Sequence, residues 1–153
     1  MWVVCWLYYC NKIENRKNLN TMIYAADKLS TFSKYKVSKI ADIVGKFCIE
    51  NLGKKRNRSY PTILLSYVKD PEFMGEYCSD EHIVIVYVNK CKTISELTST
   101  IIHEWTHSKQ NIIGQYSKLY KKFGYDNHPM EVEAYASEKI WNRKCLNFLR
   151  KNI

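Results

Sequence analysis

Residues 94–113, ISELTSTIIHEWTHSKQNII, are the stretch of sequence that decides how this chain folds. Thr93 and Glu96 have the Thr-x-x-Glu spacing of a helix-capping box, and Gly114 stands where a helix is commonly stopped. Apolar residues recur between these two signals at helical spacing, namely Ile94, Leu97, Ile101, Trp105 and Ile112. The stretch therefore predicts one helix with a buried face.

The same stretch contains HEWTH, an H-E-x-x-H motif formed by His103, Glu104 and His107. Residues four apart lie on one face of a helix, so both imidazoles can point at a single metal ion. Two neutral imidazoles are typical zinc ligands, and the glutamate between them is placed to act as a general base. The motif predicts a zinc site with Glu104 beside it.

A catalytic zinc site needs a third protein ligand, and the sequence offers three candidates. A His-x-x-Gly-x-x-His continuation of the motif fails, because Gln110 and Ile113 occupy its last two positions. Downstream, a last helix is predicted from Pro129, and its first turns carry Glu131 and Glu133, with His128 directly before it. The two glutamates point about 200° apart around a helix, so only one of them can face the metal.

At this point the chain resembles the gluzincin peptidases, a zincin group that carries a glutamate ligand on the helix after H-E-x-x-H. Glu131 and Ala134 match its Glu-x-x-Ala pattern, while Tyr135 replaces the usual acidic or amide residue. The resemblance implies zinc held by His103, His107 and Glu131. It leaves the hydrogen-bond partner behind the histidine ligands to be found, with Glu138 and Asp126 as candidates.

The predicted fold is a minimal zincin-like α+β domain over residues 1–153. Helical spacing from Thr21 to Leu29 and from Val37 to Leu52 predicts N-terminal helices. A small mixed sheet follows, with one strand at 60–68 and a hairpin or bent pair of strands at 77–78 and 82–88 around a turn at 79–80. The H-E-x-x-H helix, a short helix at 116–123 and a C-terminal helix from Pro129 to about Arg150 come after it. By the zincin resemblance, an exposed edge strand holds the substrate backbone, and the expected strand is Ile83, Val84, Ile85, Val86 and Tyr87.

The resemblance implies a zinc-dependent peptidase, in which Glu104 takes a proton from the attacking water and passes it to the leaving amine. The oxyanion needs a further donor. Tyrosines at 116, 120, 125 and 135 and His128 all lie near the motif, with Tyr125, Tyr135 and His128 preferred. An intact Glu104 favours an enzyme over a zincin fold kept only as a binding module.

The formal charge of +9 admits nucleic acid as a partner, with the densest basic run at 54–58. His128 as third ligand would resemble the SprT-like proteases, which act on protein crosslinked to DNA, although their zinc ribbon is absent.

Six scattered cysteines without a Cys-x-x-Cys pair indicate reduced thiols, or disulfides given the even number. The apolar opening at 2–10 is too short to span a bilayer and a poor secretory signal, which predicts a cytoplasmic protein.

Overall fold

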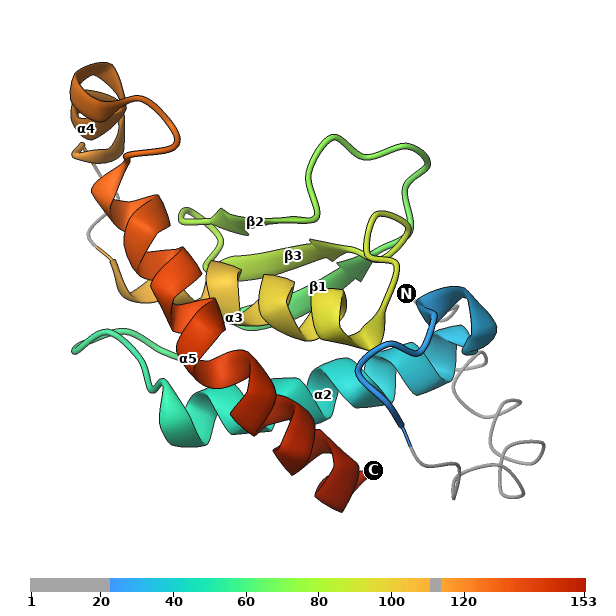
Figure 1. Ribbon diagram of the computed structural model, residues 1–153. Coiled ribbons are helices and arrows are strands. Elements are labelled where there is room, and N and C mark those ends of the chain that lie inside the picture. The colour runs from blue at the N-terminus through green and yellow to red at the C-terminus, as the bar shows by residue number, and fades with distance from the viewer. Residues whose placement is uncertain (1–22, 111–113) are drawn as a thin grey trace, which may run out of the picture.

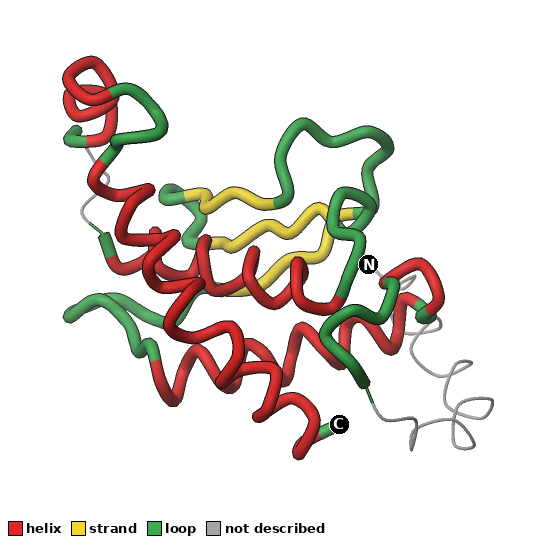
Figure 2. Tube along the Cα trace, in the orientation of Figure 1, coloured by secondary structure: helices red, strands yellow, loops and turns green. Residues whose placement is uncertain are grey.

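The structure is a computed structural model, and it describes residues 23–110 and 114–153. The apolar opening of the chain and Ile112 lie outside the described residues. The helices are a short 3₁₀ helix η1 (Leu29–Thr31), α2 (Lys34–Asn51), α3 (Ile94–Lys109), α4 (Tyr116–Phe123) and α5 (Pro129–Asn152). Three strands complete the fold, β1 (Thr62–Ser66), β2 (Gly75–Cys78) and β3 (Ile83–Tyr87). The predicted α+β class is confirmed (Figures 1 and 2).

The three strands form a mixed sheet in the order β1-β3-β2. β1 runs parallel to β3, and β2 runs antiparallel to it. The prediction that Ile83–Tyr87 is an edge strand is therefore wrong, because β3 is paired along both of its sides. The strand nearest the H-E-x-x-H helix with an open side is β2, which pairs only with β3 among the described residues.

One face of the sheet packs on the helices. Val84 and Val86 of β3 are fully buried on that face, whereas Leu64 of β1 is 50% exposed. This period of two is what a strand gives when one side meets a core and the other meets water. In Figure 1, α3 runs along the sheet, α5 crosses in front of α3, and α2 lies below.

Helix α3 is the centre of the hydrophobic core. Its predicted apolar face is fully buried or nearly so, at Ile94, Leu97, Ile101 and Trp105. Thr93 Oγ1 accepts the backbone N–H of Glu96 at 3.2 Å, as a capping box requires. The Glu96 side chain accepts the backbone N–H of Lys92 at 2.6 Å, one residue earlier than that motif expects.

The helix predicted for Thr21–Leu29 is absent where the structure describes that segment. Residues 23–28 form a turn and a single bridge, and only η1 is helical. The carbonyls of Ala25 and Asp27 accept the N–H groups of Ser95 and Ile94 instead. The N–H groups of Ile94 and Ser95 lie in the first turn of α3 and have no partner within that helix. Because the carbonyls of Ala25 and Asp27 bond these groups, they are not used for a helix over residues 21–29.

The remaining helix ends differ in how they are capped. α5 begins as predicted, with Pro129 in its first turn and the His128 side chain as N-cap. α3 ends at Lys109 with Gln110 as its C-cap, earlier than the stop expected at Gly114. α4 buries no side chain and stands apart at the top of Figure 1. No helix among the described residues is both long and apolar enough to cross a membrane.

Candidate metal centre

Two helices bring together in the core three side chains that could bind a metal ion. α3 supplies His103 and His107, one turn apart, and the first turn of α5 supplies Glu131. His103 Nε2 lies 3.2 Å from Glu131 Oε2, and His107 Nε2 lies 3.6 Å from Glu131 Oε1. One ligand atom from each residue lies within 4.8 Å of the others, so this group could hold a metal ion.

Glu138, two turns along α5 from Glu131, orients His103. Its Oε1 lies 2.6 Å from His103 Nδ1. An unprotonated carboxylate can only accept a hydrogen bond, so Nδ1 carries the proton and Nε2 is left facing Glu131. Of the two residues considered as hydrogen-bond partners of the histidines, Glu138 contacts His103, whereas Asp126 is exposed in the turn before α5.

Gln110 orients His107 through a chain of hydrogen bonds. The Gln110 amide nitrogen donates to Met130 O and to Glu133 Oε2, both at 2.9 Å. The amide oxygen therefore faces His107 Nδ1, at 2.7 Å, and accepts the proton of that nitrogen. When either ring is neutral, its proton is therefore held on Nδ1, and Nε2 is the nitrogen that could bind a metal.

Burial and neighbouring charges shift the pKa values of the three candidate ligands. Burial lowers the pKa of His103, but its contacts with the Glu131 and Glu138 carboxylates outweigh this and raise it to about 9. The pKa of His107 is raised in the same manner against burial. Burial would raise the pKa of Glu131, yet hydrogen bonds from His103 and His107 hold it well below its usual range. Without a metal, ring protons provide the positive charge beside Glu131.

Glu104 lies on α3 between the two histidines and is 8% exposed. Burial raises the pKa of its carboxyl to about 7, against the opposing effect of His107 and His103. A carboxyl poised near neutrality suits a general acid–base group. β2 approaches this residue closely at Gly75, where a methyl group added to the glycine would lie 3.0 Å from Glu104 Cγ and 2.6 Å from Thr100 Cγ2.

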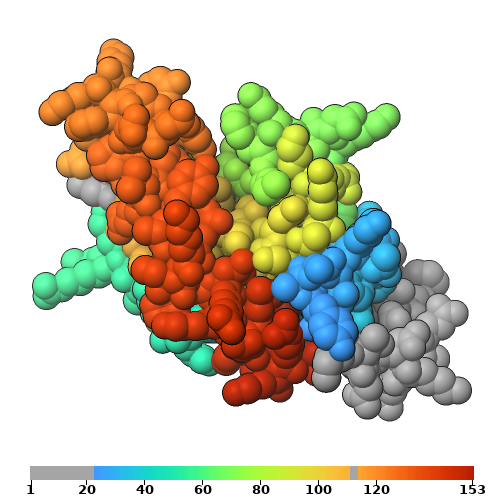
Figure 3. All heavy atoms as spheres, viewed as in Figure 1, coloured from blue at the N-terminus to red at the C-terminus, as the bar shows by residue number. Residues whose placement is uncertain are grey.

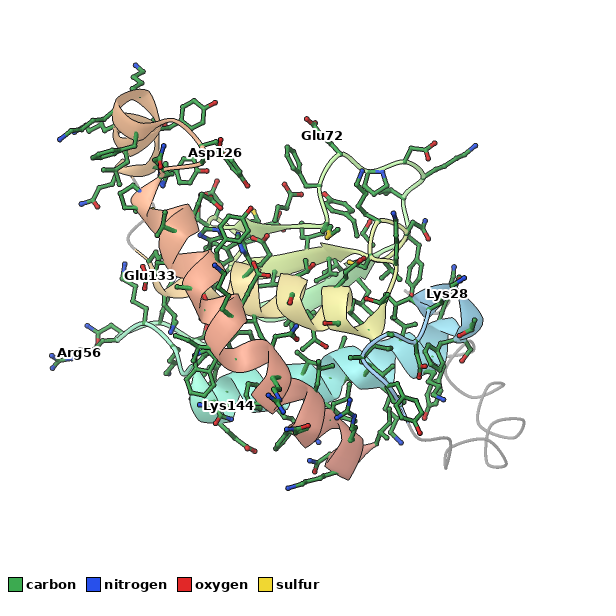
Figure 4. The ribbon with its side chains drawn as sticks, in the orientation of Figure 1. Lys28, Arg56, Glu72, Asp126, Glu133 and Lys144 are labelled. Atoms are coloured by element: carbon green, nitrogen blue, oxygen red, sulfur yellow. The ribbon has the colours of Figure 1, made fainter. Side chains whose placement is uncertain are left out.

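The two alternative ligands are engaged elsewhere. His128 Nδ1 accepts the N–H of Met130 at 3.2 Å, so its Nε2 donates to Tyr116 O at 3.1 Å. Neither nitrogen is free for a metal, and the His128 side chain is instead the N-cap of α5. Glu133 is exposed and bonds Gln110; Figure 4 shows it on the outer flank of α5.

The candidate tyrosines differ in their contacts. Tyr116 donates a hydrogen bond to Glu131 Oε1 at 2.9 Å, and its ring stacks on His128 at 4.1 Å between centroids. Burial and this carboxylate raise the pKa of Tyr116 to about 12, so it remains a donor. The ring of Tyr135 meets His103 edge-on at 4.9 Å, and Tyr125 is hydrogen-bonded to Tyr135. Tyr120 is exposed on α4.

A cleft of about 450 Å³ opens beside the metal centre. His103 and Glu104 form part of its floor, Tyr125, Tyr135 and Glu138 line one wall, and residues 72–75 line the other. Figure 3 shows the surface hollowed between the α4–α5 region and the segment that precedes β2. Glu72 marks that segment in Figure 4. The cleft gives solvent and ligands a route to Glu104.

Sequence reasoning missed two contributors to this site. From the sequence, Gln110 was noted only because it stands where a His-x-x-Gly-x-x-His continuation needs a glycine. A polar side chain three positions after His107 can nevertheless reach the His107 ring. The approach of Gly75 to Glu104 joins residues 29 apart in the chain and has no local signal. Compared with family models, curated proteins and solved structures, the chain matches none.

Proposed function

We propose that this protein is a zinc-dependent peptidase, with zinc held by His103, His107 and Glu131 and with Glu104 as general base. The observation that carries this proposal is the convergence of both Nε2 atoms on one buried carboxylate, beside a second carboxyl that opens onto a cleft. A purely structural metal site has no need of Glu104 at that position. A hydrolytic site does.

The donor set fits zinc. Four-coordinate zinc holds its ligands at about 2.0–2.1 Å, which spaces them about 3.3 Å apart. In the metal-free structure His103 and His107 contact different oxygens of Glu131, at 3.2 and 3.6 Å, and one ligand atom from each residue lies within 4.8 Å of the others, so the three side chains would draw closer together around zinc. Two imidazoles with one carboxylate are a donor set typical of catalytic zinc. When bound, zinc would lower the pKa of a water molecule and polarise the scissile carbonyl.

The protein side chains would carry the proton transfers. Glu104, ionised at the start of the cycle, takes one proton from the attacking water. The same carboxyl, now protonated, delivers that proton to the amine nitrogen as the peptide C–N bond breaks. Burial, which raises the pKa of Glu104, favours its return of the proton in the second half of this cycle. Tyr116 holds the Glu131 carboxylate in place throughout.

Two tyrosines remain as donors to the oxyanion. Tyr125 and Tyr135 line the cleft and are hydrogen-bonded to each other, whereas Tyr116 is engaged by Glu131. We assign the hydroxyl of Tyr125 or Tyr135 to this role. The pKa of Tyr125 is raised, first by burial and then by the nearby Glu131 charge, which keeps its proton available to donate.

The substrate backbone would lie along β2 rather than β3. β2 is an edge strand of the sheet, and its first residue, Gly75, lines the cleft next to Glu104. An extended peptide can pair with an open strand edge through main-chain hydrogen bonds. Such pairing would bring the peptide past Glu104 without a requirement for any one side chain.

The test compares the parent protein with Glu104→Gln, using metal analysis by mass spectrometry and cleavage of unfolded protein. We expect one zinc per chain in both proteins, and cleavage only by the parent. His103→Ala serves as the control that loses both properties. Cleavage by Glu104→Gln at the parent rate would overturn the general-base role, and a parent without zinc after reconstitution would overturn the metal centre.

A further inference from the structure

The two candidate histidine ligands are supported at Nδ1 by residues of different kinds. His103 Nδ1 meets the Glu138 carboxylate at 2.6 Å. His107 Nδ1 meets the amide oxygen of Gln110 at 2.7 Å. A carboxylate only accepts hydrogen bonds, so the contacts behind His103 end at Glu138. An amide also donates, so the contacts behind His107 continue beyond Gln110.

The donors of Gln110 reach the first turns of α5. Its Nε2 donates to Met130 O and to Glu133 Oε2, both at 2.9 Å. These acceptors lie one residue before and two residues after Glu131 in the chain. The amide nitrogen has two protons, and both are used by the helix that carries the third candidate ligand. One side chain therefore connects His107 on α3 with the turn of α5 that carries Glu131.

The backbone of Gln110 fixes where this connection is made. α3 ends at Lys109, and Gln110 follows in an extended conformation, with φ −77° and ψ 160°. Its own N–H donates to His107 O at 3.1 Å. Gln110 is therefore held to His107 through both its backbone and its side chain, while the chain itself leaves the helix.

Glu133 lies at the outer end of these contacts. It is exposed, whereas Glu131 is 4% exposed. A carboxylate accepts an N–H more strongly than a neutral group does. In a chain of hydrogen bonds each contact also polarises the next. The contact with Glu133 therefore makes the Gln110 amide oxygen a better acceptor for the His107 ring proton.

We propose that Gln110 is a positioning residue for the metal centre and that Glu133 acts through it. The inference rests on the function proposed above, and it adds two residues outside the ligand set on which zinc affinity depends. Gln110 holds the His107 ring with Nε2 toward Glu131, and it holds the first turn of α5 against the end of α3. Glu133 keeps the amide nitrogen turned outward, which leaves the amide oxygen facing His107.

Zinc affinity, measured by competition against a chelator on the full chain, tests this inference without any need for turnover. We expect Gln110→Ala to weaken zinc binding about 10-fold to 100-fold, as is usual for groups behind metal ligands. Glu133→Ala leaves every ligand intact and should weaken binding about fivefold, the effect of one hydrogen bond of ordinary strength.

Glu133→Gln is the matched control for Glu133→Ala. Its amide oxygen can still accept from Gln110 although the charge is lost, so its zinc affinity should stay within about twofold of the parent. Equal losses in the two variants would show that only the charge of Glu133 matters and would overturn its role in the chain of contacts. Glu133 is exposed, so this comparison tests the inference even if Gln110→Ala fails to fold.

The double variant Gln110→Ala/Glu133→Ala decides whether the two residues act through one chain. If Glu133 acts through Gln110, the double variant binds zinc as weakly as Gln110→Ala alone. Losses that multiply would mean that Glu133 acts independently and would overturn that part of the inference.

NMR of the zinc-loaded protein tests the orientation of His107 itself. Its Nδ1 proton should exchange slowly with water in the parent and in Glu133→Gln, and rapidly in Gln110→Ala, where it has lost its acceptor. A ring proton that Gln110→Ala leaves unchanged would contradict the positioning role.

The outcomes separate this inference from the peptidase function. A parent that binds zinc but cleaves no peptide would remove the peptidase function alone, and the losses of zinc affinity would still support the role of Gln110. A parent that cleaves peptide, with zinc affinity unchanged by Gln110→Ala, would overturn the inference alone. A parent that binds no zinc would overturn both.

Discussion

The three candidate metal ligands and the rim of the cleft lie side by side but differ in burial. His103, His107 and Glu131 are 9%, 7% and 4% exposed and sit on helices packed in the core. Phe73 and Tyr125, on the rim, are 56% and 45% exposed. Ligand geometry is thus fixed by the packing that holds the fold together, whereas the rim can change without disturbing it. Substitutions in the two regions should therefore differ clearly in their effects on zinc affinity, unfolding free energy and activity.

Glu131→Gln should have the largest effect. It removes the negative charge and one ligand from a buried site, and we expect zinc affinity to fall at least about a hundredfold, since even changes to groups behind the ligands cost 10–100-fold. The measurement is competition against a zinc chelator of known affinity. Asp126→Asn, at an exposed carboxylate in the turn before α5, is the matched control, and its affinity should stay within about threefold of the parent. Equal losses in both variants would refute the assignment of Glu131.

The pH dependence of the metal-free protein tests the same buried charges. The pKa of His103 is about 9 in the fold against 6.5 for the free side chain. Its raised pKa adds stability that is complete below 6.5 and is lost as the pH rises toward 9. Glu131, with a lowered pKa, adds stability that is lost only as the pH falls below about 4.5.

Metal-free protein should therefore lose stability on the order of 2–3 kcal/mol as the pH rises from 6 toward 9. Urea unfolding after chelation, at several pH values in this range, measures the loss. Zinc-loaded protein is the control, because bound metal replaces the ring protons and removes most of the slope. A metal-free protein whose stability is flat over this range would contradict the charged His103–Glu131 pair.

Gly75→Ala probes the place where the core meets the rim. An added methyl group would lie 2.6 Å from Thr100 Cγ2 and 3.0 Å from both Glu104 Cγ and the Ile85 carbonyl oxygen, so α3 and β2 must separate. We expect a loss of about 1–3 kcal/mol in unfolding free energy, with reduced cleavage because Glu104 is displaced.

Gly45→Ala on α2 is the control for Gly75→Ala. Its added methyl group would lie 3.0 Å from Ile63 Cδ1, the end of a side chain that can turn away. Alanine is also favoured over glycine within a helix by about 1 kcal/mol, so the net change should be near zero. Equal unfolding midpoints for the two variants would show that β2 does not abut Glu104 closely.

Features that depend on residues close together in the sequence could be predicted, whereas features that depend on distant segments meeting in space could not. His103, Glu104 and His107 follow from helical spacing within one segment, and His128 and Pro129 mark the start of α5 by local capping chemistry. The position of β3 could not be predicted, since strand order depends on which segments meet in space. The missing helix near Ala25 has the same cause, because its carbonyls bond α3, about 70 residues later.

Tyr125→Phe should have the smallest effect on the fold and still reduce activity. The side chain is 45% exposed, so loss of its hydroxyl should change the unfolding free energy by less than about 0.5 kcal/mol. If Tyr125 donates to the oxyanion, kcat should fall about 10²-fold or more with KM nearly unchanged, because that hydrogen bond forms only in the transition state. Tyr120→Phe, on the exposed surface of α4, is the matched control and should alter neither value. A parent-like kcat for Tyr125→Phe would move the role to Tyr135, whose ring packs against His103 and whose hydroxyl can be removed in the same way.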